Sequence, residues 1–598
     1  MKKQYEQKDR QPEPVERSGS ASASATKPGL DRRSFLKGGL TFGAAAFGAA
    51  IAPKAAFAKG AEGLPLDDFT SELAGTTWSD AEPVVPLDPP ATWDDETEVV
   101  VVGSGGGGLA AALYLATAGK KVIMVEKNPS FGGETASATA MICYSGTRQQ
   151  NERGVPHDVD KLVDSFASRH IYPPNGHHRD LLRQMIVKGP EFIDWFIDQG
   201  APMILPPHLN DTYVAFEPRT AGIPGMRMVN ATNFASAKAA ELGADCRLLQ
   251  KCTGLVMDGE RAVGIKAMDL DSRREYYIKA STAVVLAGGG MASNRDMLQR
   301  WIPTAAQTVK ASMCYPGQDG FCQRLGLGAG ADMDGWDSFM CFCGGLDVDE
   351  WNRRIREGDV QIARQPWLGI DNTGKRYPYI SSHDEKWPLW NAFTVQAQIL
   401  QSLPNSWGYV FFDAKYEDHY ELFAEGGCRA GECPSDTAPE QILGIDPVSW
   451  RDGVLRSIER GFIKTGSNFS ELAEQLEIDP AVVNEAVNDW NAMCEKGKDP
   501  DFNFDKKWLI PLENPPYYAM KIGAQLMSTY CGLRVSTGMA VIDTKGKPIP
   551  GLFAASNTIG GVIGNSSNGG GECDPLGCCC LAWTTGYVCA QGILGETV

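Results

Sequence analysis

The sequence lacks the features of several common protein classes. Its 598 residues carry a formal net charge of −18, and the body of the chain has no basic run. A nucleic-acid-binding protein needs a positive face that displaces counterions from phosphates, so nucleic acid is not an expected partner. After the first sixty residues no stretch of about 18 uninterrupted apolar residues occurs, the length that a membrane-spanning helix needs. We therefore expect a soluble body.

The composition is that of a folded globular protein. Hydrophobic residues make up 43% and charged residues 22%, a mixture that excludes intrinsic disorder and fibrous repeats. The length corresponds to three or four packed units of roughly 150 residues. Such a chain buries a large core without disulfides, so its sixteen cysteines need another explanation.

The first sixty residues have the composition of an export signal. A polar segment, 1–30, precedes Arg32-Arg33-Ser34-Phe35-Leu36-Lys37 and the Gly/Ala-rich run 38–52, and Ala56-Phe57-Ala58 offers a peptidase site. The paired arginines resemble a twin-arginine signal peptide, so we expect residues 1–58 to direct export to the periplasm or the outer face of the cytoplasmic membrane. Proteins exported this way fold beforehand in a reducing compartment, which argues against disulfides. An uncleaved membrane anchor stays an alternative, although residues 38–52 are too few to span a bilayer.

The composition of the chain changes at Glu98. Before it lies a Pro- and Asp-rich stretch, 59–95, that we interpret as a linker. Residues 99–102 are all valine, and such an apolar run suits a parallel strand buried on both faces. The turn Gly103-Ser104-Gly105-Gly106-Gly107-Gly108 follows, then a helical run, 109–118, and a second strand, 121–125, that ends at Glu126. This order of elements is typical of a dinucleotide site.

Each part of this motif has a physical role. Gly103 makes the tight turn, Gly105 lets the backbone approach a pyrophosphate, and Gly108 packs the helix against the strand. The helix N-terminus offers unpaired N–H groups and a positive dipole end to the phosphates. Glu126 can accept hydrogen bonds from both ribose hydroxyls, and it excludes an NADP site, where a cation would meet the 2′-phosphate. The motif alone leaves NAD and FAD as alternatives.

Three further segments bear on this choice. Gly132-Gly133-Glu134-Thr135 follows the acid, residues 282–290 form a buried strand that ends in glycines, and residues 549–557 form a short strand that runs into a polar turn. In this order the segments resemble the flavoprotein family of soluble fumarate reductases, urocanate reductases and 3-ketosteroid dehydrogenases, over roughly residues 96–592. The resemblance also includes residues 138–147, the Gly-Gly-x-x-x-Asn ending of residues 285–294, Gly317-Gln318-Asp319-Gly320, Gly374-Lys375-Arg376-Tyr377 and residues 547–552.

The resemblance implies FAD as the cofactor. In that family the adenine ribose lies on the residue that matches Glu126, residues that match Thr135 and Asp319 lie near the flavin, and the residue that matches Asn557 binds the cofactor. Glu134 stands where the family usually has asparagine. The expected cofactor-binding residues are Gly103, Ser104, Gly105, Gly107, Gly108, Glu126, Lys127, Gly133, Glu134, Thr135, Ala287, Gly288, Asp319 and Asn557.

The resemblance also implies an α/β fold, a Rossmann-like FAD-binding domain with an inserted α+β capping substrate domain. The FAD-binding domain is expected in two parts, 96–309 and 516–598, and the cap at 310–515, with the flavin at the seam. Local patterns fit this organisation. Residues 180–199 have helical spacing, and residues 246–269 alternate around a turn, as a small antiparallel meander does.

Reduction of an activated C=C bond, the chemistry that the resemblance implies, needs a hydride from flavin N5, a protein acid and an electrophile that polarises the substrate. The catalytic Arg-Asp pair of the family falls, with one deletion, on His383-Asp384. We expect His383 to donate the proton near neutral pH and Asp384 to orient it. A surface histidine in a turn is an equal alternative. Tyr530 and Tyr379 are further candidate acids, and Arg376 is expected to support the loop.

The residues that hold a dicarboxylate in fumarate reductases are missing here. The family's His-His-Thr matches Met527-Ser528-Thr529, its substrate-binding arginine matches Ser567, and its histidine matches Ile563. Burying a dianion without those cations costs several kcal/mol, so fumarate is a poor candidate. The steroid-binding Tyr-Pro-Gly of ketosteroid dehydrogenases is replaced by Asn568-Gly569-Gly570.

Aromatic residues in or near the cap favour a bulky, ring-containing enone, although core packing can explain each one separately. We therefore expect an exported FAD-dependent reductase of an activated C=C bond in a bulky substrate that is not a dicarboxylate. A ketosteroid-type dehydrogenase in the oxidative direction and an exported flavin electron carrier or sensor without an organic substrate are the alternatives. The aromatic residues are Trp301, Trp336, Trp367, Trp387, Trp390 and Tyr530.

The cysteines leave three alternatives. An iron–sulfur cluster and a redox disulfide near the flavin rank below buried inert thiols, because adjacent cysteines do not converge easily on one cluster. No other metal site is expected. The cysteines in question are Cys341 and Cys343 in the cap and Cys573, Cys578, Cys579, Cys580 and Cys589 near the C-terminus.

The sequence contains no recognisable source of electrons. It has no Cys-x-x-Cys-His motif for a c-type haem and no second glycine-rich fingerprint for NADH. We therefore expect a separate electron-donor protein, a cytochrome or a quinol-linked membrane protein. Contact with a membrane is expected only through that partner or an uncleaved anchor.

Overall fold

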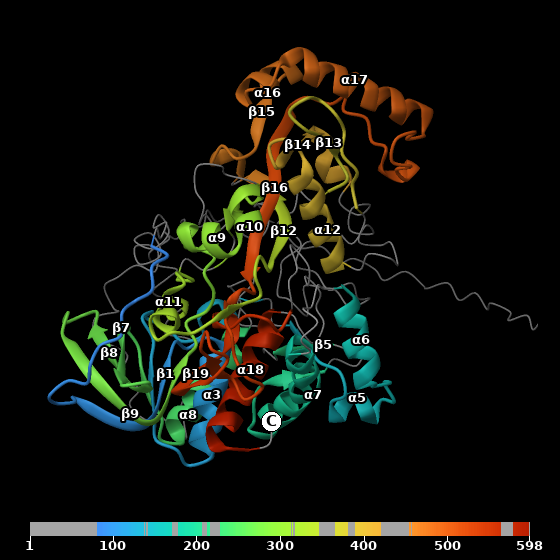
Figure 1. Ribbon diagram of the computed structural model, residues 1–598. Coiled ribbons are helices and arrows are strands. Elements are labelled where there is room, and N and C mark those ends of the chain that lie inside the picture. The colour runs from blue at the N-terminus through green and yellow to red at the C-terminus, as the bar shows by residue number, and fades with distance from the viewer. Residues whose placement is uncertain are drawn as a thin grey trace, which may run out of the picture. The chain divides into compact units, whose positions relative to one another are not determined.

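The computed structural model describes residues 80–596 with internal gaps (Figure 1). Not described are residues 137, 139–140, 170–176, 206–211, 216–227, 313, 315–316, 346–364, 381–388, 420–453, 456 and 564–577. The described residues all belong to one compact unit, Ala56–Val598. The predicted export signal, 1–58, lies outside the described residues and stays a prediction.

An eight-stranded sheet forms the core of the first part of the fold (Figure 1). Six strands run in the order β18-β19-β9-β1-β2-β6, and β8 pairs with both β9 and β7. β1 pairs in parallel with β2 and β9, and β9 pairs in parallel with β19. This arrangement confirms the predicted Rossmann-like α/β class. The strands are β1 (Asp95–Val102), β2 (Val122–Val125), β6 (Asp245–Arg247), β7 (Gln250–Asp258), β8 (Arg261–Asp269), β9 (Glu275–Leu286), β18 (Ala540–Ile542) and β19 (Pro548–Ala554).

Helix α3 (Gly106–Thr117) follows the glycine turn and lies beside α18 (Cys578–Leu594) (Figure 1). The predicted buried strand before it is β1, whose residues 99–102 are all buried. A Cβ on Gly586 of α18 would lie 2.0 Å from the carbonyl oxygen of Gly107 in α3. The two helices therefore touch backbone to backbone, and a helix from the end of the chain completes the packing around the glycine turn.

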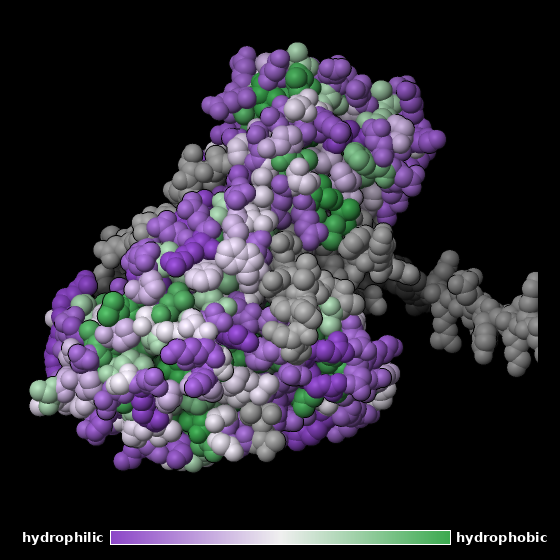
Figure 2. Space-filling view, viewed as in Figure 1, coloured by the Kyte–Doolittle hydropathy of each residue, from purple (hydrophilic) through white to green (hydrophobic). Residues whose placement is uncertain are grey.

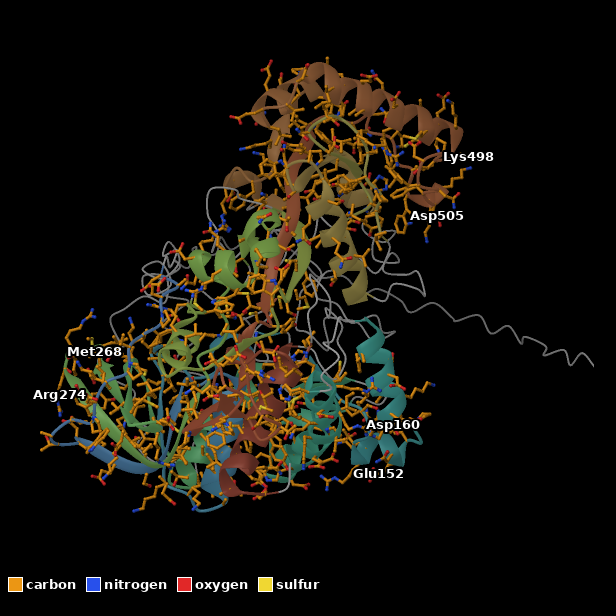
Figure 3. The ribbon with its side chains drawn as sticks, viewed as in Figure 1. Glu152, Asp160, Met268, Arg274, Lys498 and Asp505 are labelled. Atoms are coloured by element: carbon orange, nitrogen blue, oxygen red, sulfur yellow. The ribbon has the colours of Figure 1, made fainter. Side chains whose placement is uncertain are left out.

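β7 and β8 form the predicted antiparallel hairpin, which joins the sheet through β9. Met268 and Arg274 lie at the ends of the turn between β8 and β9, and Figure 3 labels both. The stretch that we interpreted as a linker is docked here where it is described, at 80–94. Leu87 N donates to the Leu255 carbonyl at 2.8 Å, and Met257 N donates to the Leu87 carbonyl at 2.9 Å. Leu87 therefore adds to the edge of this hairpin, while Val84 N donates to the Arg324 carbonyl at 3.0 Å, so the stretch is held by partners far along the chain.

A second sheet of six strands is built around β16 (Tyr517–Thr529), which pairs with β10, β12, β14 and β15. The strand after Pro515-Pro516 therefore pairs with strands of the region expected to form the cap, beyond the residue at which we expect the cap to end. The chain returns to the first sheet only at β18. The other strands are β10 (Ala311–Ser312), β12 (Phe339–Gly345), β13 (Leu368–Ile370), β14 (Trp407–Asp413) and β15 (Lys464–Gly466).

The helix predicted at 180–199 is α7 (His177–Asp198), which ends before Gly200 in the left-handed region (φ +95°). A separate apolar cluster contains Leu368, Phe411 and Trp490 and includes residues of α16 (Phe469–Gln475) and α17 (Pro480–Lys496). Further helices are α4 (Gly133–Ala136), α5 (Arg148–Glu152), α6 (Val159–Arg169), α8 (Met228–Glu241), α9 (Arg295–Trp301), α10 (Pro303–Thr308), α11 (Phe321–Gly328), α12 (Leu389–Ser402) and the 3₁₀ turns η2 (Ala414–His419), η3 (Lys506–Trp508) and η4 (Ser556–Thr558). Two small sheets consist of β3 (Met141–Cys143), β5 (Thr212–Ala215) and β4 (Met203–Ile204), and of β11 (Met333–Asp334) and β17 (Gly532–Leu533).

The face in Figure 2 is mostly hydrophilic, with hydrophobic side chains in small patches. None of the helices in the described ranges is both long and apolar enough to cross a membrane. The large hydrophobic side chains that are exposed among the described residues are Val85, Ile204, Leu242, Trp336, Leu455 and Phe502.

The contact between α18 and α3 makes a prediction about stability. Gly586→Ala adds a methyl group where the Gly107 carbonyl oxygen already lies, so it should lower the free energy of unfolding by about 1–3 kcal/mol. Urea unfolding followed by circular dichroism measures this change. Both variants are compared without the expected cofactor, and Gly105→Ala is the matched control, since its Cβ would have no heavy atom within 4 Å. Equal stability of the two variants would contradict the contact.

Candidate active site

Two glycines of the turn lie where backbone atoms leave no room for a side chain. Gly103 has φ +96°, and a Cβ on it would lie 2.5 Å from the carbonyl oxygen of Ala287. A Cβ on Gly108 would lie 2.0 Å from the carbonyl oxygen of Gly103. Gly288, the next residue after Ala287, is packed equally closely, because its Cβ would lie 2.5 Å from Cys322 Sγ. The turn can therefore pack against the end of β9 only because glycines stand at these positions.

Gly105 faces open space. A Cβ on Gly105 would have no heavy atom within 4 Å, and its φ of −62° suits any residue. Gly133 faces the same region, since a Cβ on it would find only backbone atoms of Gly105, at 3.7 and 3.9 Å. The polypeptide thus leaves room where a pyrophosphate would approach the N-terminus of α3.

Glu126 lies buried at the end of β2, beside the turn. Its Oε2 accepts hydrogen bonds from Ser104 N at 2.8 Å and Ser104 Oγ at 2.6 Å, and its Oε1 accepts from Asn128 N at 2.9 Å. An ionised carboxylate has about four acceptor sites, so these three bonds leave Glu126 about one site, enough for a single ribose hydroxyl. The structure therefore brings together the acid and the turn, as the sequence predicts.

Helix α4 is tied to the same turn. Thr135 Oγ1 accepts a hydrogen bond from Gly106 N at 3.0 Å, which satisfies one of the first N–H groups of α3. Gly132 N donates to the carbonyl of Ser104 at 3.0 Å. Glu134 lies in the first turn of α4, next to Thr135. These contacts place the predicted Gly-Gly-Glu-Thr segment beside the glycine turn.

Lys127 and Asp319, both expected to bind the cofactor, form an ion pair with each other. Lys127 Nζ lies 2.8 Å from Asp319 Oδ2 and donates to the carbonyl of Gly317 at 2.9 Å. Burial lowers the pKa of Lys127, but the Asp319 carboxylate outweighs burial and holds that pKa above its ordinary value. The charged groups therefore satisfy each other and fasten the turn around Gly317 to the end of β2.

Three buried amide oxygens near the end of β9 have no hydrogen-bond partner among the described residues. They are Gln318 Oε1, Gln323 Oε1 and Asn557 Oδ1. Asn557 Nδ2 donates to Ser528 Oγ at 2.6 Å, and Gln323 Nε2 donates to the carbonyls of Gly289 and Asn557 at 2.9 and 3.1 Å. A buried acceptor without a donor costs roughly 1–3 kcal/mol. The ribityl hydroxyls and the ring N–H of FAD are donors, so the expected cofactor fits this site.

The described side chains next to these amides are neutral. Ser528 and Thr529 end β16, and Thr529 Oγ1 accepts a hydrogen bond from Met291 N at 3.1 Å. Ile563, which stands at the position of the family's histidine, is a buried aliphatic residue. Ser567, at the position of the arginine, lies outside the described residues. This part of the site offers hydrogen bonds without a cation for a dicarboxylate.

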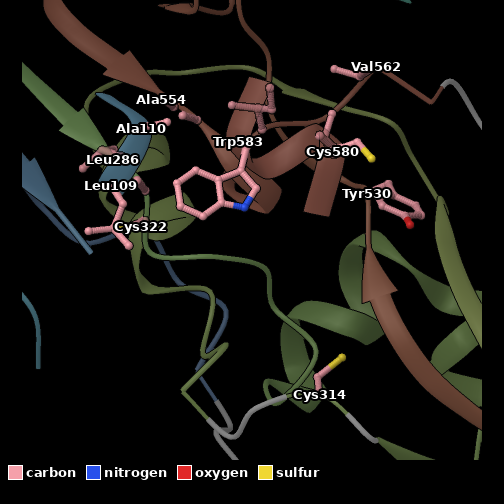
Figure 4. Packing of buried hydrophobic residues seen from close by; sticks show 14 of the residues in the cluster. Leu109, Ala110, Leu286, Cys314, Cys322, Tyr530, Ala554, Val562, Cys580 and Trp583 are labelled. Atoms are coloured by element: carbon pink, nitrogen blue, oxygen red, sulfur yellow. The ribbon is translucent and has the colours of Figure 1, made fainter. Parts of the chain in front are cut away.

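Tyr530 follows Thr529 and is buried. Its hydroxyl lies 3.8 Å from Met340 Sδ, and its backbone N donates to the carbonyl of Ser338 at 2.9 Å. Figure 4 shows its ring in the same buried cluster as Trp583. These surroundings favour a packing role for Tyr530 over the role of proton donor.

Arg376 is held by carboxylates in the cap. Its Nη1 and Nη2 donate to the two carboxylate oxygens of Asp499 at 3.0 and 2.9 Å, and its guanidinium lies 5.1 Å from the ring centroid of Trp490. Burial raises the pKa of Asp499, but the hydrogen bonds from Arg376 outweigh burial and lower the pKa to about 2. These contacts favour the supporting role that we expect for Arg376.

His383 and Asp384 lie outside the described residues, so their catalytic role stays a prediction. The segment before them is anchored to α12. Ile380 N donates to Gln396 Oε1 at 2.9 Å, and Gln396 Nε2 donates to the carbonyl of Pro378 at 3.2 Å. These bonds position the root of the predicted catalytic loop.

Tyr379, the other candidate acid, lines a small cavity in the cap with Gln365, Trp367 and Gln396. The cavity measures about 20 Å³, which is room for a single water. This space cannot admit an organic substrate. Tyr379 packs edge-on to Phe504, with ring centroids 5.9 Å apart.

The aromatic residues expected near the substrate do not form one group where they are described. Trp301 and Trp336 contact each other edge to face, with centroids 6.2 Å apart, and the Trp336 side chain is half exposed. Trp367 stacks on Phe412 at 5.4 Å. Packing therefore explains Trp367, while Trp387 and the side chain of Trp390 lie outside the described residues.

The described cysteines are not joined by disulfides. Cys580 Sγ lies 3.2 Å from Cys143 N and 3.1 Å from the Cys143 carbonyl oxygen. Burial raises the pKa of Cys252 to about 12 and raises that of Cys589 as well, so these thiols are protonated at neutral pH. No group of three His, Cys, Asp or Glu side chains in the described part of the chain could hold a metal ion. Cys573 lies outside that part.

Sequence reasoning missed three residues of this site. Gln318 had a signal, since it lies within the quoted Gly-Gln-Asp-Gly motif, whereas Gln323 had none. Trp583 of α18 lies against Gly106, whose Cβ would be 3.3 Å from the indole, and stacks on Phe192 with centroids 5.7 Å apart. Its position becomes visible only when α18 packs on α3.

Comparison with known proteins identifies the family of this protein. The FAD binding domain family matches residues 98–573, which is more than half of the chain, and the protein therefore belongs to that family. The cofactor prediction is thus confirmed, and the protein is an FAD-dependent oxidoreductase.

Three relatives illustrate the likeness. Urocanate reductase of Eggerthella lenta is 25% identical over 518 residues, which cover 83% of this chain and 75% of that protein. Digoxin reductase of the same organism is 25% identical over 583 residues, which cover 90% of this chain and 92% of that protein. The open conformation of a flavocytochrome c3 fumarate reductase has the same fold, with a TM-score of 0.62, 22% identity and coverage of 84% of this chain and 80% of that chain. The resemblance to fumarate and urocanate reductases is therefore confirmed.

The open space at Gly105 predicts a variant that separates cofactor binding from folding. In Gly105→Ala the methyl group enters the space for the pyrophosphate, so FAD should bind at least about tenfold more weakly. The free energy of unfolding of the FAD-free protein should not change, because no protein atom is within reach of the methyl group. Flavin fluorescence titration and urea unfolding measure the two quantities. Unchanged FAD affinity would contradict the placement of the pyrophosphate.

The ion pair of Arg376 and Asp499 predicts a pH dependence. The pKa of Asp499 in the folded protein, about 2, lies below its ordinary value of 3.8, so the pair stabilises the fold fully above pH 4 and loses this effect as the pH falls toward 2. Asp499→Asn should lower the free energy of unfolding at pH 7 by about 1–2 kcal/mol, because the bonds from Arg376 to an ionised carboxylate are lost. The difference from the unmutated protein should shrink between pH 4 and pH 2. A difference that stays constant over this range would disprove the pKa shift.

Proposed function

We propose that the protein reduces an activated C=C bond in a bulky substrate that is not a dicarboxylate. Bound FAD supplies the hydride. The observation that carries this proposal is the neutral character of the positions where the family has its substrate-binding histidines: Met527 and Ser528 at the end of β16 and the buried aliphatic Ile563 stand there. Two carboxylates would lose their hydration there without gaining an ion pair, which costs several kcal/mol.

Two of the three reported relatives support a substrate that is not a dicarboxylate. The names of two of them state that they reduce urocanate and digoxin, and the digoxin reductase matches nearly the full length of both chains. An enone or a related conjugated group needs a hydrogen bond at its carbonyl instead of a pair of cations. Hydroxyl and amide groups such as those of Ser528 and Gln318 can provide hydrogen bonds of this kind.

In this proposal His383 protonates the α-carbon and Asp384 orients the imidazole. Gln396 and Arg376 act indirectly. Gln396 bonds to the backbone of Pro378 and Ile380, and Asp499 bonds to Arg376. The segment 376–380 is therefore fixed at both ends, just before the predicted catalytic residues.

The supply of electrons and the location of the protein belong to the same proposal. Residues 1–58 direct the folded, FAD-loaded protein to the periplasm or the outer face of the cytoplasmic membrane. A separate cytochrome or a quinol-linked membrane protein delivers the electrons there. Mass spectrometry of the exported protein tests the first step, because cleavage after Ala58 removes a segment of defined mass.

Anaerobic reoxidation tests the reaction. The purified protein is reduced with dithionite, and the flavin absorbance is followed after adding enones, fumarate, urocanate or an artificial electron acceptor. Reoxidation by an enone, and not by fumarate, is the expected result. Brisk reoxidation by fumarate would overturn the substrate class. Exchange with electron carriers alone would point to an electron carrier, and oxidation of a saturated ketone by the oxidised protein would point to a dehydrogenase.

The proposed proton donor is tested by His383→Ala. The variant should bind FAD as the unmutated protein does, yet turn over at least about a hundredfold more slowly, because general acid catalysis contributes a factor of this size. Asp384→Asn is the companion variant and should lower turnover less. Equal turnover of the unmutated protein and His383→Ala would remove His383 from the mechanism.

A further inference from the structure

Gln318 is a buried residue of the cofactor site whose side chain has an unused acceptor. It lies in the turn between Gly317 and Gly320, and its side-chain Oε1 has no hydrogen-bond partner among the described residues. The backbone around it is fixed, because Ser293 N donates to the Gln318 carbonyl at 2.9 Å. The acceptor Oε1 therefore belongs to a residue whose backbone is held in place.

The acceptor lies at the glycines that follow β9. A Cβ placed on Gly290 would lie 2.8 Å from Gln318 Oε1, 2.3 Å from Thr529 Oγ1 and 3.6 Å from Asn557 Cβ. A Cβ placed on Gly289 would find only Gln318 Cγ within 4 Å, at 3.6 Å. Gln318 thus borders an open space beside Gly289, and Asn557 approaches Gly290 from another element, η4.

Gln323 has a different role, although its Oε1 is also unpartnered. Its Nε2 is held between two carbonyl oxygens, those of Gly289 and Asn557, at 2.9 and 3.1 Å. This amide links the segment after β9 to η4. Gln318 has no comparable brace to the backbone, which makes its acceptor the one that a ligand can use.

We propose that Gln318 accepts a hydrogen bond from bound FAD, on the side of Gly290 that Asn557 also faces. This inference depends on the binding of FAD and not on the proposed substrate. The donor on the cofactor is either a ribityl hydroxyl or an N–H of the flavin ring. In both cases the bond fills an acceptor that the polypeptide leaves empty.

The test compares Gln318→Leu with the unmutated protein, both with and without FAD. The variant should bind FAD about tenfold more weakly, the factor that about 1.4 kcal/mol carries. The FAD-free variant should be as stable as the FAD-free unmutated protein or more so, because an unpaired buried oxygen has been removed. A residue with only a structural role would instead destabilise both forms equally.

Gln591→Leu is the matched control. Gln591 is also buried, its Oε1 is also unpartnered, and it lies on α18 more than two turns beyond Trp583. This variant should leave FAD affinity unchanged. Unchanged FAD affinity in Gln318→Leu, or an equal loss of stability with and without FAD, would overturn the proposal.

The reduction potential of the flavin then identifies the donor in Gln318→Leu. A bond to a ring N–H that changes between the oxidised and reduced flavin shifts the potential, whereas a bond to a ribityl hydroxyl leaves it unchanged. Spectroelectrochemical titration measures this potential independently of substrate turnover. The result therefore does not depend on whether the proposed enone is the substrate.

Discussion

The fold of the cofactor site depends on contacts between backbone atoms that exclude every side chain. The carbonyl oxygen of Ala287 approaches Gly103, that of Gly103 approaches Gly108, and that of Gly107 approaches Gly586 of α18. Such contacts have no tolerance for a methyl group, since close-packed backbone cannot give way. Because β9 and α18 follow the turn at long sequence distances, the glycine turn is packed by segments from distant parts of the chain.

A second consequence is that the polypeptide leaves part of its own core incomplete. The oxygens of Gln318, Gln323 and Asn557 are buried without donors in the described part of the chain. Each represents a cost that folding alone does not recover. A ligand that binds the folded form and supplies donors to such oxygens stabilises that form.

The first sheet could be predicted largely from local patterns. The apolar run before the turn, the glycines and Glu126 lie within about thirty residues, and each position follows from the element it begins or ends. The failures concern pairings over long distances. Residues 80–94 look like a linker because the partner of Leu87, on β7, lies far along the chain. The pairing of β16 with β14 and β15 is another case, since the local sequence does not state which strands the chain joins next.

In the site, too, local motifs could be predicted and contacts between distant segments could not. The residues that surround the pyrophosphate position follow from one motif, but Lys127 and Asp319 pair with each other across two segments that the motif does not connect. Arg376 and Asp499 are another such pair. The neutral surroundings of Gly290 come from Thr529, Gln318 and Asn557 in three separate segments, and only the folded chain reveals that these polar groups converge.

Strand β16 connects the sheet of the cap with the predicted cofactor site. At one end it carries the cap sheet, pairing with β14 and β15, and at the other end Ser528 and Thr529 hold Asn557 and the backbone of Met291. A strand transmits displacement along its axis with little stretch. A shift of one residue in the register of β16 would move each of its side chains to the opposite face of the sheet. The pairing of β16 in the cap sheet therefore also fixes the positions of Ser528 and Thr529.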